Sequence, residues 1–174
     1  METLRVILKR KSVRGFKSVQ IPDNALNIII KAGCAAPVAN GDYSSLHLGI
    51  IQNRLMLNRI RAAISEAAGE KADFLYGAPT LIIISSRQRG ALHIEVANAA
   101  CVAQNMMLMA TDLEIGSVYV LGPVLAFKPD AEWAKELELP DNFFPTAAVA
   151  LGYSAGRPGA AKQMINTIPI RHLI

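Results

Sequence analysis

The sequence predicts a single α+β domain built around a central β-sheet. Stretches with helical periodicity are interleaved with β-branched apolar runs, but without the strict strand–helix–strand order of a parallel α/β fold. The 174 residues are the ordinary length of one domain, and the chain holds no repeats, low-complexity tracts or linkers. Residues 1–174 are therefore assigned to one domain.

Two helices are expected before the first strand. Residues 3–10 combine a suitable N-cap at Thr3 with apolar side chains at helical spacing. A second helix is capped by Asp23, and Pro37 and Gly41 end it.

The next segments predict two strands separated by a helix. Residues 46–51 form a short apolar run, and Asn53 is placed to cap a helix whose apolar residues recur every three or four positions. Residues 80–85 are continuously apolar and rich in β-branched side chains. Such a run predicts a central strand that is covered on both faces.

Residues 93–114 are the longest helix candidate, and residues 99–113 are apolar almost all round. About 20 apolar residues would suffice for a membrane span, but four polar residues interrupt the run and strands follow it at once. We therefore expect a buried helix at a subunit interface and no membrane association. The interrupting residues are Asn98, Gln104, Asn105 and Asp112.

The last third of the chain predicts two more strands and a short helix. Residues 117–121 form a strand that a Gly-Pro pair ends, and Asp130 caps a helix that runs through Leu137. Residues 146–151 form the final strand, and the tail from Gly156 onward is irregular.

Composition favours a self-associating protein with a local anion site. The mean hydropathy of +0.28 is high for a small soluble chain, so a second subunit is expected to cover apolar surface. The net charge is +4, and five cations crowd into residues 9–17. One such cluster indicates an anion site rather than a nucleic-acid surface. The start of the chain lacks an apolar leader, so the cytoplasm is expected, with Cys34 and Cys101 reduced and buried.

Several common catalytic motifs are absent or incomplete. Residues 152–156 match the G-x-S-x-G pattern of a hydrolase elbow, but no Asp or Glu follows Ser154 to complete a triad. The three histidines are scattered and form no metal-ligand spacing. Neither a dinucleotide-binding G-x-G-x-x-G nor a phosphate-binding P-loop is present.

An ordered set of segments resembles the nitroreductase family over nearly the whole chain. The segments are 10–16 with the helix end at 35–37, then 76–79, 103–110, 113–118 and 150–153. The resemblance implies a central mixed β-sheet flanked by helices, a long buried helix at the interface of a homodimer, and FMN held between the subunits.

The resemblance also assigns the basic segment to the cofactor. Arg10 and Ser12 match the family's contacts to the flavin phosphate, with Lys11 nearby. A guanidinium and a hydroxyl are suitable partners for such a dianion. Arg14 matches the position near the flavin pyrimidine edge, where a cation stabilises the negative charge that develops on reduction.

Three further segments are matched to the cofactor. Leu121 and Gly122 correspond to the backbone beside flavin N5, where a glycine permits close approach. The second subunit is expected to lay residues 37–39 beside the ring. A cation near the chain end is expected to reach the phosphate; Lys162 is the assignment, and Arg157 and Arg171 remain alternatives. The second-subunit residues are Pro37, Val38 and Ala39.

Two departures from the family pattern concern the substrate side of the site. In residues 37–45, the serine that often follows the proline in the family is absent, and so is the family's Q-P-W. The chain is also short for the family, so the helical insertion that often covers the site is expected to be reduced. The sequence therefore predicts a more open flavin face.

The resemblance implies an NAD(P)H-dependent FMN oxidoreductase. Hydride passes from NAD(P)H through flavin N5 to a nitro compound, a quinone or another small electrophile in ping-pong order, and no side chain need act as acid or base. One alternative is a non-catalytic flavin- or nucleotide-binding protein on the same scaffold. Another is an α+β interaction protein whose basic segment is only a solvated surface.

Overall fold

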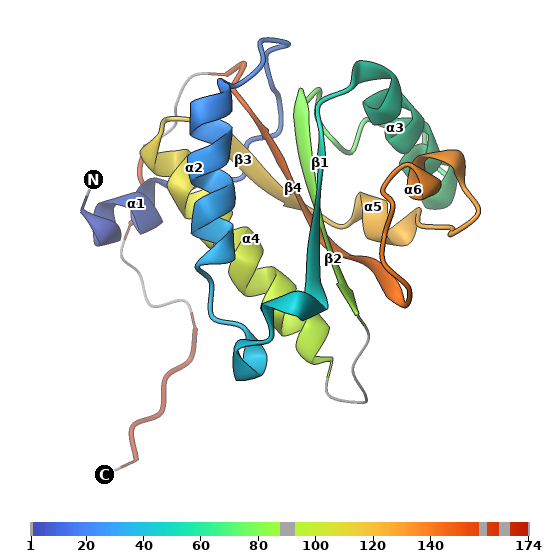
Figure 1. Cartoon of the computed structure of the whole chain (residues 1–174). Coiled ribbons are helices and arrows are strands. Elements are labelled where there is room, and N and C mark those ends of the chain that lie inside the picture. Colours follow the sequence, from blue (N-terminus) through green and yellow to red (C-terminus); the bar gives the residue numbers. More distant parts are fainter. Residues whose placement is uncertain (1, 88–92, 157–159, 164–167, 174) are drawn as a thin grey trace.

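The computed structural model describes residues 2–87, 93–156, 160–163 and 168–173. Its centre is a four-stranded sheet in the order β1-β2-β4-β3, with helices on both faces (Figure 1). This arrangement confirms the predicted α+β class. The strands are β1 (Leu46–Ile51), β2 (Thr80–Arg87), β3 (Gly116–Val120) and β4 (Phe143–Gly152).

The sheet differs in one respect from the mixed sheet that was expected. All three strand pairs, β1·β2, β2·β4 and β3·β4, are antiparallel. Among the described residues, parallel pairing is limited to an isolated bridge between Ser12 and Ser117. Since β3 lies at the edge of the sheet, that bridge is where the basic segment joins it.

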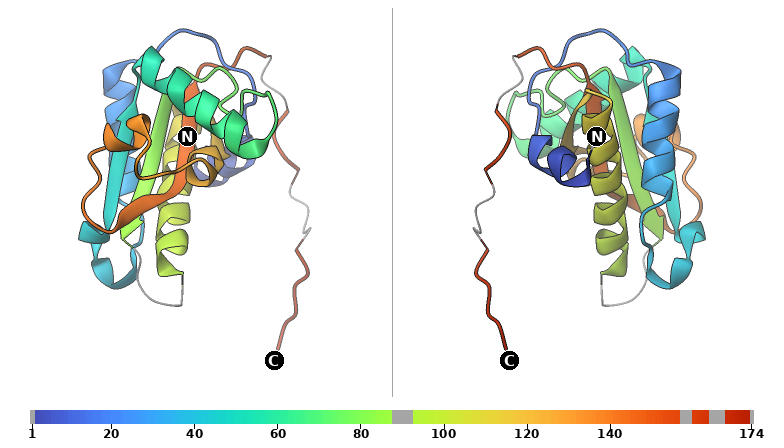
Figure 2. Two further views of the ribbon diagram at one scale, coloured as in Figure 1. Left: turned by 90° about the vertical axis from the view of Figure 1, so that its right-hand side faces the viewer. Right: turned by 90° about the vertical axis from the view of Figure 1, so that its left-hand side faces the viewer.

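Helices α2 and α4 cover one face of the sheet, and α3, α5 and α6 cover the other (Figures 1 and 2). Helix α1 lies beside the end of α4. The helices are α1 (Thr3–Lys9), α2 (Asp23–Cys34), α3 (Arg54–Ala68), α4 (Ile94–Asp112), α5 (Gly122–Leu125) and α6 (Glu132–Lys135), with short 3₁₀ turns η1 (Ala39–Gly41) and η2 (Tyr43–Ser45).

Strand β2 explains the continuous apolar run. Its first seven residues are buried. Ile82 and Ile84 belong to the core beneath α2 and α4, whereas Leu81 and Ile83 belong to the core beneath α3, α5 and α6. Because successive strand residues point to opposite faces, both faces need apolar side chains here, which confirms the prediction of a central strand.

Of the four N-cap residues that the sequence predicts, the structure confirms one and contradicts three. The Asn53 side chain accepts hydrogen bonds from the N–H groups of Leu55 and Met56 at 2.9 and 3.1 Å, so it is the N-cap of α3. Thr3 and Asp23 are instead the first helical residues of α1 and α2. Asp130 precedes an extended Ala131, so α6 begins at Glu132 rather than at an Asp130 cap.

The longest helix, α4, is buried on one side only within this chain. Its buried side packs against α2 and the sheet, and Gly33 of α2 allows the closest approach because a Cβ there would collide with Met106. Its other side is open, with Val96 48% exposed. None of the helices in the described ranges is long and apolar enough to span a bilayer.

The two cysteines are free, but their predicted burial is wrong for Cys34. Cys34 is exposed at the end of α2, and Cys101 is half-buried on α4. Residues 26, 29 and 33 define the buried face of α2. Cys34 follows Gly33 directly and is therefore turned about 100° away from it around the helix.

Candidate functional site

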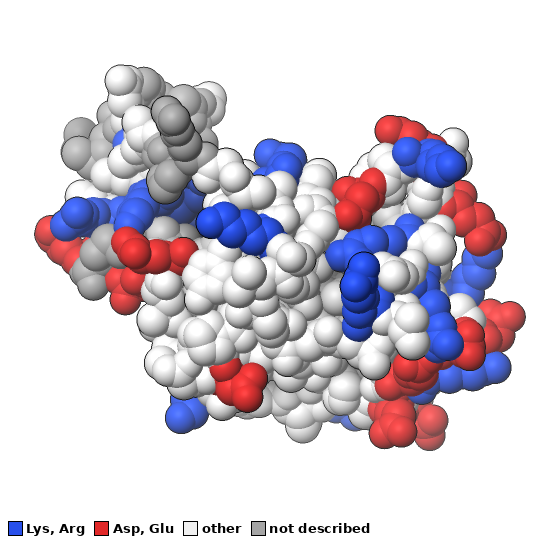
Figure 3. All heavy atoms as spheres, turned by 90° about the horizontal axis from the view of Figure 1, so that it is seen from above, with Lys and Arg blue, Asp and Glu red and all other residues white. Residues whose placement is uncertain are grey.

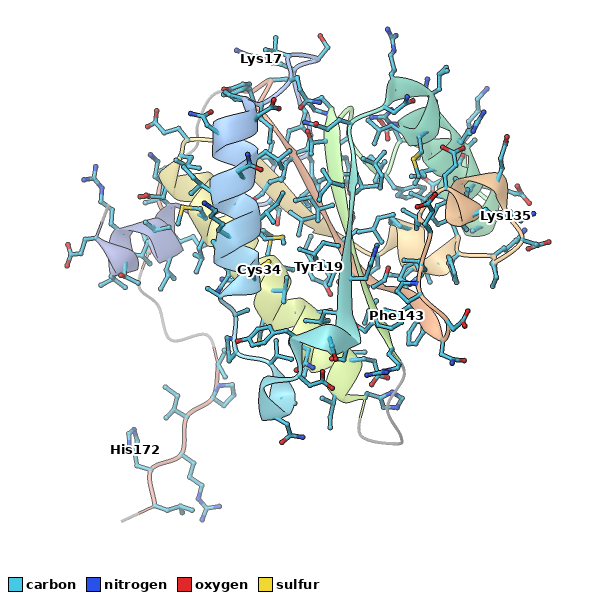
Figure 4. The ribbon with its side chains drawn as sticks, in the orientation of Figure 1. Lys17, Cys34, Tyr119, Lys135, Phe143 and His172 are labelled. Carbon is cyan, nitrogen blue, oxygen red and sulfur yellow. The ribbon has the colours of Figure 1, made fainter. Side chains whose placement is uncertain are left out.

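The basic segment that follows α1 is attached to the ends of β3 and β4 by backbone hydrogen bonds. The N–H of Val13 donates to the carbonyl of Ser117 at 3.0 Å, and the N–H of Lys17 donates to the carbonyl of Tyr153 at 2.8 Å. Residues 12–17 thus form an anchored strap across the end of the sheet, and Lys17 lies at its upper rim (Figure 4). Anchored backbone limits where the charged side chains can reach.

A hollow of about 670 Å³ lies between this strap, the end of α4 and the start of β3. Its lining carries four cations and one acid. Lys9 Nζ lies 3.4 Å from Glu114 Oε1, which neutralises that one cation. Seen from above, Lys and Arg side chains lie around an uncharged central area, with Asp and Glu side chains beside them at both sides (Figure 3). The cations that line the hollow are Lys9, Lys11, Arg14 and Lys17.

A residue from the tail adds a further cation next to the basic segment. The N–H of Lys162 donates to the carbonyl of Leu8 at 3.0 Å, which holds the tail against α1. Loss of water contact, followed by the charges of Arg10 and Lys11, lowers the pKa of the Lys162 ammonium. The structure therefore brings Arg10, Lys11 and Lys162 together from opposite ends of the chain.

No acid compensates this cluster within the part of the chain that the structure describes. The described ion pairs leave Arg10, Lys11 and Lys162 without a carboxylate partner. Arg171, one of the sequence-based alternatives, is exposed in the terminal stretch that leads away from the body (Figure 2). Arg157, the other alternative, lies outside the described residues.

Two serines add hydroxyl groups where the strap meets β3. Ser12 is exposed beside the hollow. Ser117 is only 1% exposed, and among the described residues its hydroxyl oxygen has no hydrogen-bond partner. A buried hydroxyl without a partner is destabilising unless another group satisfies it. Sequence reasoning did not select Ser117 as a site residue, because its burial depends on the docking of the distant strap.

Leu121 and Gly122 lie at the opposite end of β3, beside a second hollow of about 290 Å³. Leu121 is 50% exposed. A Cβ on Gly122 would lie 2.8 Å from Ile64 Cγ2, so this glycine is also required for α5 to pack against α3. The side chains around the second hollow are mainly apolar and include those of Ile64, Phe74, Tyr76, Tyr119 and Leu125.

The edge strand connects the two hollows. A strand of five residues is about 17 Å long, and Gly116 and Ser117 line the first hollow whereas Val120 and Leu121 line the second. Burial raises the pKa of the Tyr119 phenol, which lines the second hollow. An elongated ligand along this edge would meet a cationic end and an apolar end.

The loop before β2 supports the second hollow; its residues 76–79 carry part of the family resemblance, but the sequence did not predict its conformation or its contacts. Tyr76 adopts a left-handed conformation with φ +57°, which is strained for a residue with a large side chain. The Asp73 carboxylate holds this turn by accepting hydrogen bonds from the N–H groups of Leu75 and Gly77. The carbonyl of Tyr76 accepts from the N–H of Phe16 at 3.1 Å, which ties the loop to the basic strap.

Pro37, Val38 and Ala39 do not reach the basic hollow of their own chain. The N–H of Ala39 donates to Asn98 Oδ1 at 3.0 Å, near the start of α4. The hollow includes Thr111 at the far end of α4. These positions are about 20 Å apart along the helix, so residues 37–39 lie at the opposite end of this face (Figure 1).

The G-x-S-x-G segment forms part of the strap's docking site. Ser154 pairs with Phe16 in an isolated bridge, and its hydroxyl donates to the carbonyl of Gly156 at 3.2 Å. Within the described ranges no group of His, Cys, Asp and Glu is placed to hold a metal ion. The structure therefore defines a cation-lined hollow joined by an edge strand to an apolar one.

Such a site, on an antiparallel sheet with helices on both faces, defines a protein suited to a ligand with an anionic end and an apolar end. The sequence model of the nitroreductase family matches residues 7–153. The chain belongs to the nitroreductase family and is an oxidoreductase.

Two relatives carry related names. A protein of Methanothermobacter thermautotrophicus named "Putative NADH dehydrogenase/NAD(P)H nitroreductase" is 27% identical over 162 residues, covering 91% of this chain and 81% of its own length. An NADPH-flavin oxidoreductase of Vibrio harveyi is 28% identical over 181 residues, covering 96% of this chain and 70% of its own.

Solved structures show the same fold. A nitroreductase of Bacteroides fragilis with bound FMN has a TM-score of 0.82 and 28% identity, covering 99% of this chain and 100% of that chain. A nitroreductase of Desulfitobacterium hafniense with bound FMN has a TM-score of 0.86, covering 100% of this chain and 99% of that chain. At 22% identity, the second likeness shows the fold alone.

Proposed function

We propose that the chain binds FMN and uses it to carry a hydride from NAD(P)H to a small electrophile, such as a nitro compound or a quinone, in ping-pong order. The observation that carries this proposal is the uncompensated cluster of Arg10, Lys11 and Lys162 beside the edge strand of a nitroreductase fold. A flavin phosphate is a dianion, so it would supply the negative charge that this cluster of cations is missing.

The residues around the cluster fit the phosphate of FMN. The Arg10 guanidinium can donate two parallel hydrogen bonds to phosphate oxygens, and the ammonium groups of Lys11 and Lys162 add charge. Ser12 lines the basic hollow together with Lys11, and the buried Ser117 hydroxyl lacks a partner among the described residues. Together these groups supply donors and positive charge but no competing carboxylate.

The edge strand leads from this phosphate site toward the apolar hollow that would receive the ring. Bound FMN supplies the chemistry, since its ring system accepts and donates a hydride. Arg14, which lies on the strap and lines the basic hollow, would stabilise negative charge at the pyrimidine edge. The backbone at Leu121 and Gly122, at the other end of β3, would contact the ring and orient it.

A homodimer is part of this proposal. Residues 37–39 cannot reach the hollow of their own chain, so their expected role beside the ring requires a second copy. Apolar side chains that such a copy would cover are exposed on α4, at the apolar hollow and on the tail. They are Val96, Leu121, Leu125, Ile168, Ile170 and Leu173.

The test is the visible spectrum of protein saturated with FMN under anaerobic conditions. We expect NADPH or NADH to bleach the flavin band, a quinone or nitro compound to restore it, and steady-state double-reciprocal plots to give parallel lines. Failure to take up FMN would overturn the proposal. Bound FMN that neither dinucleotide reduces would indicate the non-catalytic flavin-binding alternative instead.

A further inference from the structure

Lys17 is a cation in the basic hollow that the flavin does not account for. Lys9 is paired with Glu114 at 3.4 Å. The cluster around Lys162 is assigned to the flavin phosphate, and Arg14 to the pyrimidine edge. Lys17 also lines the hollow, is exposed, and has no ion-pair partner among the described residues.

The position of Lys17 is fixed although its side chain is free. Its N–H donates to the carbonyl of Tyr153 at 2.8 Å, and the preceding Phe16 is hydrogen-bonded through its N–H to the carbonyl of Tyr76. Lys17 therefore lies at the outer rim of the strap, close to where the strap meets the loop of the apolar hollow (Figure 4). A ligand that spans from the apolar hollow to solvent would pass this rim.

We infer that Lys17 makes the enzyme prefer NADPH to NADH by contacting the phosphate that NADPH carries on its adenosine ribose. This inference rests on the proposed function. In this inference the nicotinamide ring lies against the flavin at the apolar hollow, and the adenosine half passes the rim at Lys17 on its way to solvent. NADH lacks the additional dianion and gains nothing from a charge at that place, so the charge selects between two otherwise identical donors.

The expected selectivity is modest because the rim is exposed. An exposed ion pair typically changes a binding affinity by a factor of about five or less. Salt weakens them, since the Debye length falls from about 10 Å at 0.1 M to about 3 Å at 1 M ionic strength. The preference for NADPH should therefore be clear at low salt and shrink at high salt.

The test compares the wild-type enzyme loaded with FMN against Lys17→Gln, Lys17→Arg and, as a matched control, Lys31→Gln. Lys31 is exposed on α2 and does not line the hollow, so its replacement removes the same charge elsewhere. Two quantities are measured at low and high salt. They are the dissociation constants of NADP⁺ and NAD⁺, and the ratio of kcat/KM for NADPH to that for NADH.

At low salt we expect Lys17→Gln to lower the preference for NADP⁺ over NAD⁺ in binding, and that for NADPH over NADH in kcat/KM, each by about threefold to fivefold. Lys17→Arg and Lys31→Gln should keep the wild-type preferences. Equal preferences in Lys17→Gln and the wild type would overturn the inference while the proposed function stands. A wild-type protein that binds FMN but oxidises neither dinucleotide would overturn both.

Discussion

The backbone N–H of Lys162 donates a 3.0 Å hydrogen bond to the carbonyl of Leu8, which joins the tail of the chain to its first helix. This contact places the Lys162 ammonium where Arg10 and Lys11 oppose its charge. Three cations that repel one another are unfavourable in the free protein. A bound dianion would convert that repulsion into attraction, so the arrangement is suited to phosphate.

FMN affinity should therefore decrease at alkaline pH, because Lys162 loses its charge there. The pKa of Lys162 is lowered in the free protein, and a bound dianion would raise it again. Binding then takes up a proton, so affinity is greatest below the free-protein pKa and falls as the pH rises through it. Titration of flavin fluorescence from neutral to alkaline pH measures this decline.

Two variants separate the charge of Lys162 from its bulk. Lys162→Gln should weaken FMN binding at neutral pH by about threefold to tenfold and flatten the alkaline decline. Lys162→Arg should bind well and also lose the decline, since an arginine does not titrate in this range. An unchanged pH profile in Lys162→Gln would remove Lys162 from the phosphate site.

Arg10 should contribute more to FMN binding than any other cation of the cluster. Replacing it leaves a phosphate without its bidentate partner, which costs about 2 kcal/mol, or roughly 30-fold in affinity. Calorimetric titration of Arg10→Ala with FMN measures the loss. Arg5→Ala is the matched control, because Arg5 is exposed on α1 and lines neither hollow. Equal affinities in the two variants would favour a merely solvated basic segment.

Ser117→Ala should have opposite effects on the free and the FMN-bound protein. The Ser117 hydroxyl is buried without a partner among the described residues, so its removal should stabilise the free protein by up to about 1 kcal/mol. The same variant should bind FMN less tightly if the hydroxyl serves the ligand. Chemical denaturation with and without FMN measures both effects. A loss of stability in the free protein would show that the hydroxyl has another partner.

Gly122→Ala should destabilise the protein through a contact with Ile64. The added Cβ would lie 2.8 Å from Ile64 Cγ2, and overpacking of this kind costs about 1–3 kcal/mol. Ile64→Val removes Cδ1, which the added Cβ would approach to 2.9 Å, but keeps Cγ2, so the double variant should recover only part of the loss. Urea denaturation of both single variants and the double variant gives the coupling energy, and simple additivity would contradict the account.

Local signals in the sequence predicted much of the fold. Asn53 was recognised as a cap because capping involves only the next three residues. Strand β2 was recognised because a strand that is buried on both faces must be apolar throughout. For the Gly-Pro pair at 122–123 the sequence predicts only the end of a strand. The structure continues it as the short helix α5, which a proline near the helix start permits.

The site was only partly predictable, because its decisive contacts join distant segments. Charge alone indicates the basic segment as an anion site, and the family resemblance adds the flavin phosphate and Lys162, but no local signal pairs Lys162 with Leu8. The burial of Ser117 follows from the strap that docks on β3, and the strained turn at Tyr76 depends on the Asp73 carboxylate. Burial of Cys34 was wrongly expected from apolar composition, since the face of α2 on which a residue lies decides its exposure.

The most direct test of the phosphate site compares the affinities of the purified protein for FMN and for riboflavin, which has the same ring system but no phosphate. If Arg10, Lys11 and Lys162 bind the phosphate, FMN should bind about 100-fold more tightly than riboflavin at low salt. Equal affinities for the two flavins would contradict the account.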